Sequence, residues 1–217
     1  MSDYRNSINQ EKALIWRITH IHNLEWILDS GLYSGNSDKK SKNCISIDNQ
    51  TIIERRNKIR VPLAPYGVLN DYISFYFTPF SPMMLNIHHG RGVKQQENED
   101  IIILVSSLNI LTKMKIPFVF TDGHACYSWS NFYSKLEDLD KINWTILQNR
   151  DFKRDQDNPK KFEQYQAEAL IYQSCPIEAI IGIICFNEKI KKYIENELSI
   201  RNLEQIKVFA RKNWYFE

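Results

Sequence analysis

Apolar residues along the chain gather into many short runs, and most of these runs have the length and the β-branched or aromatic content of β-strands. Polar segments and prolines separate the runs. The pattern predicts strands over residues 16–19, 72–77, 101–105, 118–120, 165–172, 180–186 and 206–210.

Helical periodicity is rarer. Asn23 is predicted to cap a helix whose apolar face carries Leu24, Ile27 and Leu28 and which ends at Gly31. A short helix is expected over 51–58, and a longer one after Asn187. The polar residues 33–50 predict a mobile loop, and residues 126–164 show little strand pattern. Many short strands with few helices indicate an α+β fold, with two packed small sheets and helices on the flanks.

Composition narrows the class of protein. A chain of 217 residues with 43% hydrophobic and 25% charged residues fits one globular domain, residues 1–217. It has no apolar run long enough to cross a membrane, and its first residues do not resemble a secretory signal. Its four cysteines include no Cys-x-x-Cys pair, so we expect reduced thiols and a cytoplasmic protein.

The net charge of +2 excludes a histone-like nucleic-acid binder, so any nucleic-acid site must be local. Basic residues do cluster, at 39–60, 150–161 and 207–212. Solvated loops explain any single cluster, whereas two clusters flanking one cleft would favour a phosphate-rich partner.

One carboxylate stands out. Glu168 begins the apolar segment Ala169-Leu170-Ile171, and a buried ionised group needs a partner or a task. A carboxylate at the mouth of paired strands can stabilise positive charge that appears in a transition state. The alternative is an edge-strand glutamate facing water.

Other residues carry weaker signals. His20, at a predicted strand-to-helix turn, can bond a ribose hydroxyl or a phosphate, or can serve structure alone. The segment 76–83 is aromatic and bounded by prolines, which suits either a stacking wall or core packing. His88, His89 and His124 lack metal-ligand spacing, so no metal is expected. No glycine-rich phosphate loop is present.

The order of these motifs resembles the DarT family of bacterial DNA ADP-ribosyltransferase toxins over about positions 14–212. The shared blocks are Arg17-Ile18-Thr19-His20, then Arg56, Asp71 to Met83, Phe118 to Ala125, and Tyr165 to Glu168 with Pro176. Ser74, where a proline is common, and His89 depart from the family pattern.

The resemblance implies the ADP-ribosyltransferase fold, NAD as co-substrate without a metal, and single-stranded DNA as the substrate. It implies Glu168 as the catalytic glutamate and Arg56 as the active-site arginine, with Arg55 as the alternative register. It implies a cofactor site formed by His20, Thr19, Gly31, Tyr76 and His124, with His20 at the nicotinamide end. It implies DNA contacts by Arg55, Trp129, Tyr133, Trp144, Lys153 and Arg154.

The usual target in this family is a thymidine base, and one relative modifies guanosine. The expected partner is a cognate antitoxin, a macrodomain ADP-ribosylglycohydrolase. Two rival functions remain open from the sequence: an ADP-ribosyltransferase that modifies protein, and a nucleic-acid-binding module without catalysis.

Overall fold

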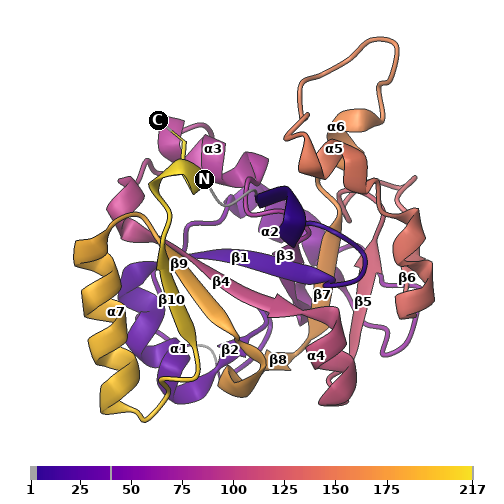
Figure 1. Ribbon diagram of the computed structural model, residues 1–217. Helices are drawn as coiled ribbons and strands as arrows, with labels where there is room; N and C mark the ends of the chain where they lie inside the picture. Colours follow the sequence, from indigo (N-terminus) through magenta and orange to yellow (C-terminus); the bar gives the residue numbers. More distant parts are fainter. Residues whose placement is uncertain (1–3, 40, 217) are drawn as a thin grey trace.

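The computed structural model describes residues 4–39 and 41–216. Helices and strands alternate irregularly along the chain (Figure 1). The helices are α1 (Leu24–Ser30), α2 (Gln50–Arg56), α3 (Pro82–His89), α4 (Leu108–Lys113), α5 (Trp144–Gln148), α6 (Lys161–Gln164) and α7 (Glu188–Ile200). The strands are β1 (Leu14–His20), β2 (Leu32–Tyr33), β3 (Tyr72–Tyr76), β4 (Ile101–Ser107), β5 (Phe118–Thr121), β6 (Phe132–Tyr133), β7 (Glu168–Tyr172), β8 (Ser174–Cys175), β9 (Gly182–Cys185) and β10 (Lys207–Ala210).

Eight of these strands form one sheet in the order β10-β9-β4-β1-β3-β7-β5-β6, and β2 pairs with β8. The predicted α+β class is confirmed. The sequence predicted two packed small sheets, whereas the structure has one large sheet and one two-stranded sheet. The two four-stranded halves of the large sheet meet where β1 pairs with β3, and that register is a single pair, Trp16 with Tyr76. By contrast, β1 pairs with β4 along all seven of its residues. We call the β1–β3 junction the seam.

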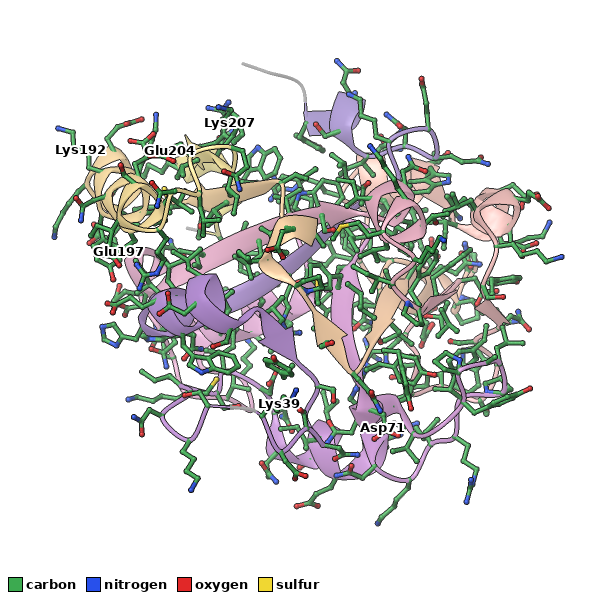
Figure 2. The ribbon with its side chains drawn as sticks, turned by 90° about the horizontal axis from the view of Figure 1, so that it is seen from below. Lys39, Asp71, Lys192, Glu197, Glu204 and Lys207 are labelled. Carbon is green, nitrogen blue, oxygen red and sulfur yellow. The ribbon has the colours of Figure 1, made fainter. Side chains whose placement is uncertain are left out.

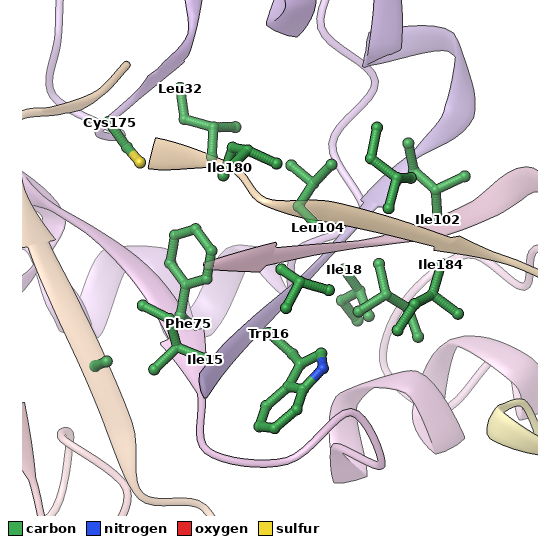
Figure 3. Packing of buried hydrophobic residues seen from close by; sticks show 14 of the residues in the cluster. Ile15, Trp16, Ile18, Leu32, Phe75, Ile102, Leu104, Cys175, Ile180 and Ile184 are labelled. Atoms are coloured by element: carbon green, nitrogen blue, oxygen red, sulfur yellow. The ribbon is translucent and has the colours of Figure 1, made fainter. Parts of the chain in front are cut away.

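Apolar packing continues across the seam where backbone pairing is sparse. Figure 3 shows Phe75 of β3 beside Ile15 and Trp16 of β1, and all three belong to one buried cluster. A second, smaller cluster around Leu69, Val119 and Leu170 is confined to the β3-β7-β5 half. Side chains therefore join the halves, since burial of apolar surface needs no backbone hydrogen bonds.

The predicted helices are present, with one change in how the first begins. Asn23 stands at the N-cap position of α1, but its side chain makes no capping bond. Helix α2 starts after Asn49, whose side chain accepts from the N–H groups of Thr51 and Ile52. Helix α7 begins after Asn187 as predicted.

Helix α3 was not predicted. Ser81 caps it and Pro82 opens it, a pairing typical of helix starts. The prolines that bound the segment 76–83 therefore begin a helix as well as end a strand. Within the parts of the chain that the structure describes, no helix has the length and apolarity that a membrane span requires.

Candidate active site

Glu168 is the first residue of β7 and is only 2% exposed. It pairs with Tyr76 of β3, and its backbone N–H donates to the buried hydroxyl of Thr121 at 3.3 Å. Because β7 is flanked by β3 and β5, the alternative of an edge-strand glutamate facing water is wrong.

Both oxygens of the Glu168 carboxylate have partners. Oε2 accepts from Nη1 of Arg56 at 2.9 Å, and Oε1 accepts from the backbone N–H of Ala125 at 2.9 Å. Burial by itself raises the pKa of the Glu168 carboxyl, but the charge of Arg56, followed by His124 and by the hydrogen bonds from Ala125 and Arg56, outweighs burial, so the pKa lies below its ordinary value. The carboxylate is therefore ionised at neutral pH.

Arg56 and Arg55 point to different places, as neighbouring residues on a helix do. Arg56, the last residue of α2, is 9% exposed and reaches Glu168. Burial works to lower the pKa of its guanidinium, but Glu168, followed by Cys126 and Tyr76, outweighs burial, so the pKa lies above its ordinary value. Arg55 instead donates to the carbonyl of Cys126 at 2.5 Å and lies 5.3 Å from the ring centroid of Tyr127.

Arg56 makes two more bonds, through Nη2, to the hydroxyl of Ser74 at 2.6 Å and to the carbonyl of Leu69 at 3.4 Å. We use the name Glu168 cluster for Glu168, Arg56, Ser74, His124 and Ala125. Ser74 was noticed in the sequence only as a departure from the family pattern, because a serine in a strand carries no chemical signal of its own.

His124 is the neutral side chain of the Glu168 cluster that lies next to the carboxylate. Its Nδ1 lies 3.5 Å from Oε1 of Glu168, yet the same nitrogen accepts the backbone N–H of Cys126 at 3.1 Å. An accepting nitrogen carries no proton, so it cannot donate to the carboxylate. Burial lowers the pKa of His124; the charge of Glu168 opposes this, and the charges of Arg56 and Arg55 add to the lowering. His124 and Glu168 are therefore neighbours rather than an ion pair at neutral pH.

Tyr76 lies beside Glu168 as its strand partner, and its hydroxyl is 3.7 Å from Sδ of Met83. Burial, followed by the charge of Glu168, raises the pKa of Tyr76 far above its ordinary value. The phenol stays protonated and can donate a hydrogen bond.

His20 and Thr19 end β1 at a separate place. Nδ1 of His20 accepts the backbone N–H of His22 at 3.2 Å, and burial, with His22 next, lowers the pKa of His20. Asn23 bonds the hydroxyl of Thr19 and both backbone groups of Ile45. We call this arrangement the Asn23 turn, and it fixes the far end of the loop that the sequence predicted over 33–50.

Gly31 has a structural reason for its identity. Its φ is +79°, and a Cβ there would lie 2.6 Å from the carbonyl oxygen of Cys175. Only glycine lets the end of α1 approach β8 this closely.

The predicted DNA-binding aromatic residues divide into exposed and packed ones. Trp129 is 53% exposed and stacks on Tyr127 at 4.9 Å, with 20° between the rings. Tyr133 stacks on Phe120, and burial, with Asp122 next, raises its pKa to about 12. Trp144 packs edge-on against Phe77 and donates to the carbonyl of Leu139. Trp129 is thus the aromatic side chain of this group that is open to a stacking base.

The basic clusters differ in their surroundings, and Lys40 of the first lies outside the described residues. In the second cluster Lys153 and Arg154 are exposed, with Arg154 5.3 Å from the ring of Phe162. Arg150 instead lies 3.6 Å from the ring of Phe80. The third cluster consists of Lys207 in β10 and of Arg211 and Lys212 after it, and β10 lies at the opposite edge of the sheet from β5 and β6 (Figure 1).

The two adjacent histidines lie on a helix. His88 and His89 are the last residues of α3, where His89 bonds the carbonyl of Leu85. Among residues 4–39 and 41–216, no group of three or more His, Cys, Asp or Glu side chains is placed to hold a metal ion.

Two cavities lie away from Glu168. One, of about 510 Å³, lies between the end of α4 and the start of β5, beside Lys115 and Lys135. The other, of about 350 Å³, lies beside Lys39 and Asp71, which Figure 2 shows on the opposite side of the view from Lys192 and Lys207. Glu168 lines neither of these two cavities.

The model of a protein family, described as ssDNA thymidine ADP-ribosyltransferase, DarT, matches residues 16–216. A DNA ADP-ribosyl transferase of Escherichia coli O127:H6 is 53% identical over 215 residues, 99% of this chain and 98% of the relative. A DNA ADP-ribosyl transferase–DNA ADP-ribosyl glycohydrolase fusion protein of Thermosipho africanus is 25% identical over 88% of this chain and 47% of its own length.

The fold also matches solved structures. DarT of Thermus sp. 2.9 in complex with ADP-ribosylated ssDNA superposes with a TM-score of 0.84 at 35% identity, over 95% of this chain and 97% of that chain. The same Thermus protein in complex with NAD+ gives a TM-score of 0.82 at 34% identity, over 95% and 98% of the two chains.

Proposed function

The chain belongs to the DarT family of ssDNA thymidine ADP-ribosyltransferases, and from this premise we propose that it transfers ADP-ribose from NAD+ to a thymidine base of single-stranded DNA and releases nicotinamide. The observation that carries the proposal is the buried Glu168 carboxylate between Arg56 and the N–H of Ala125. We propose that residues 1–217 act as one ADP-ribosyltransferase domain.

Glu168 is the proposed catalytic carboxylate. The ionised group stabilises positive charge that develops at the ribose carbon as its bond to nicotinamide breaks. Two carboxylate oxygens offer about four lone-pair sites, and Arg56 and Ala125 occupy two of them. Capacity therefore remains to accept hydrogen bonds from ribose hydroxyls.

Arg56 is the proposed binding residue for the thymine base. Its raised pKa argues against a role as a general base, because the guanidinium does not release its proton. A fixed guanidinium that donates to the carbonyl oxygens of thymine stabilises the base after it loses its N3 proton, which makes the nitrogen a better nucleophile. Nicotinamide departs with the electron pair of its bond to the ribose carbon, N3 forms the new bond to that carbon, and the N3 proton passes to solvent.

For NAD+ we propose contacts from His20, Thr19, Tyr76 and His124. The Tyr76 hydroxyl and the neutral imidazoles of both histidines have the donors and acceptors that a ribose or a carboxamide needs. Gly31 serves this site indirectly, through the close approach of α1 to β8.

For single-stranded DNA we propose stacking on Trp129 and phosphate contacts by Lys153 and Arg154, which are all exposed. A stacked base contributes about 1–3 kcal/mol. Arg55 supports the platform, because it holds Cys126 and Tyr127 beneath Trp129. Tyr133 and Trp144 are packed, so their proposed contribution is to shape the segment rather than to stack on bases.

The proposed partner is a cognate antitoxin that removes the modification, a macrodomain ADP-ribosylglycohydrolase. The Thermosipho africanus fusion supports it, since its name joins a transferase and a glycohydrolase in one chain. We propose the cytoplasm as the place of action, because the DNA of a bacterium lies there.

Mass spectrometry of a thymidine-containing oligonucleotide after reaction with NAD+ tests the activity. We expect a mass gain of one ADP-ribose on the single strand, and none on an oligonucleotide that lacks thymidine. Modification of a guanosine-only strand or of added protein would favour the rival substrates, and no modification of any of these would favour a binding module without catalysis.

A further inference from the structure

Ser74 connects two arginines that come from different parts of the chain. Its hydroxyl accepts from Nη2 of Arg56 at 2.6 Å, and its backbone carbonyl accepts from Nη1 of Arg17 at 2.8 Å. Arg17 lies on β1, Ser74 on β3 and Arg56 on α2. With the bond from Arg56 to Glu168, four residues form one hydrogen-bonded chain.

The first link of this chain crosses the seam. Because β1 and β3 share a single backbone pair, Trp16 with Tyr76, little of the backbone ladder fixes the position of Ser74 relative to β1. The guanidinium of Arg17 bonds the Ser74 carbonyl from the β1 side, where a complete ladder would supply a backbone N–H. Nε of Arg17 is buried without a hydrogen-bond partner, so Arg17 is held in an environment where losing its remaining bond is costly.

The second link decides how Arg56 is oriented. A guanidinium has five N–H donors in one plane. Those of Arg56 go to Glu168, to Ser74 and, at 3.4 Å, to Leu69. The bond to Glu168 fixes one end of the plane, and the short bond to Ser74 fixes the other. The N–H groups that make none of these bonds are then held in a set direction.

We propose that Ser74 is a positioning residue for Arg56, and that Arg17 holds Ser74 in place across the seam. This inference rests on the proposed role of Arg56 in binding the thymine base. Without the Ser74 hydroxyl, Arg56 keeps its hydrogen bond to Glu168, but its guanidinium plane rotates more freely about that bond. Binding of NAD+ is then preserved while alignment of the base is lost.

The test compares Ser74→Ala with Ser74→Thr, which retains an oxygen at the same position and suits a strand. We expect Ser74→Ala to lower kcat for oligonucleotide modification about tenfold, since small misplacements of a catalytic group have effects of this size or larger. The Kd for NAD+, measured by calorimetry, should stay within about twofold. Ser74→Thr should recover most of the lost kcat.

Arg17→Met is the second variant, and it tests the positioning role of Ser74 if Ser74→Ala does not fold. It should lower kcat in the same direction, and combining it with Ser74→Ala should add little, because both act through one path. Ser106→Ala is the matched control. Ser106 lies on a strand and donates to the carbonyl of Ala179, and it takes no part in the series of hydrogen bonds that joins Arg17, Ser74, Arg56 and Glu168. The kcat of Ser106→Ala should therefore stay at the wild-type value.

Equal losses in NAD+ affinity and in kcat, or no loss in kcat, would overturn the positioning role. A failure of Ser74→Thr to recover activity would do the same. Absence of DNA modification by the wild-type protein would instead overturn the proposed function, and the positioning role with it.

Discussion

The Glu168 cluster and the Asn23 turn are held by different kinds of bond. In the Glu168 cluster, two ionised groups are buried together, and each depends on the other for compensation of its charge. In the Asn23 turn, a neutral amide bonds Thr19 and both backbone groups of Ile45. A loop can thus be fixed by neutral bonds alone, whereas the proposed reacting centre keeps a charge that must be matched.

The largest effect should come from Glu168. Glu168→Gln keeps the shape of the side chain and removes its charge, and we expect DNA modification to fall by about 10³-fold, measured by mass spectrometry. Glu168→Ala should lose activity and also about 3–5 kcal/mol in the free energy of unfolding, because Arg56 is left buried and unpaired. Glu178→Gln, which changes an exposed carboxylate, is the control for both measurements. Near wild-type activity in Glu168→Gln would remove Glu168 from its proposed role.

Next in size is the contrast between two adjacent arginines. Arg56→Lys cannot reproduce the planar pattern of bonds to Glu168 and Ser74, so DNA modification should fall about 100-fold while the Kd for NAD+ changes little. Arg55→Lys should cost less than about tenfold in the same assays, because Arg55 acts through the carbonyl of Cys126. If Arg55→Lys is the more damaging change, the two roles must be exchanged.

A smaller effect is expected at the Asn23 turn. Asn23→Ala removes the bonds to Ile45 and should weaken NAD+ binding about tenfold in calorimetry, since the loop over 33–50, which we propose to cover NAD+, loses its anchor. Asn187→Ala, which removes the cap of α7, is matched to it, with an expected loss of about 1 kcal/mol in the free energy of unfolding. NAD+ affinity should be unchanged in Asn187→Ala, and equal affinities in the two variants would contradict the anchoring role.

A smaller difference between the Glu168 cluster and the Asn23 turn should appear in how the stability of the protein depends on pH. The pKa values of His20, His124 and Glu168 are all lowered in the folded protein. The unfolded chain therefore binds more protons, and stability falls as pH falls. The loss from the histidines should begin near their unfolded pKa of about 6.5, and that from Glu168 only below about 4.3. Thermal unfolding between pH 8 and pH 2 measures both, and His20→Gln should remove part of the first loss and none of the second.

The smallest effect concerns salt. Replacing both Lys153 and Arg154 with Gln should flatten the dependence of DNA binding on salt, by about 0.7 in the log–log slope for each phosphate that the variant no longer neutralises. Trp129→Ala should weaken binding without changing that slope, because stacking is nearly independent of salt. Fluorescence titrations of an oligonucleotide at several salt concentrations measure both. A slope that changes in Trp129→Ala alone would contradict this division of roles.

The sequence predicted the strands and helices that repeat a local pattern. It also singled out Glu168, because a carboxylate in an apolar segment is conspicuous, and the structure shows that this carboxylate is buried. It did not predict α3, although Ser81 and Pro82 carry a helix-start signal, because prolines also end strands. It predicted that Asn23 caps a helix. The actual bond of its side chain to Ile45 could not be predicted, because it depends on how a distant loop folds back. Ser74 could not be found this way, because its partner Arg56 is joined to it only by tertiary structure.

The seam between β1 and β3 has a consequence for how protection from hydrogen exchange is distributed in the sheet. Amide protons exchange with solvent when the bonds that hold them open, and units that open together exchange with a common free energy. With one backbone pair between its halves, the sheet should exchange as two cooperative units, β10-β9-β4-β1 and β3-β7-β5-β6. Glu168 belongs to the second unit and His20 to the first. Opening of one unit then lets the amides beside His20 or beside Glu168 exchange, while the amides of the other unit stay protected.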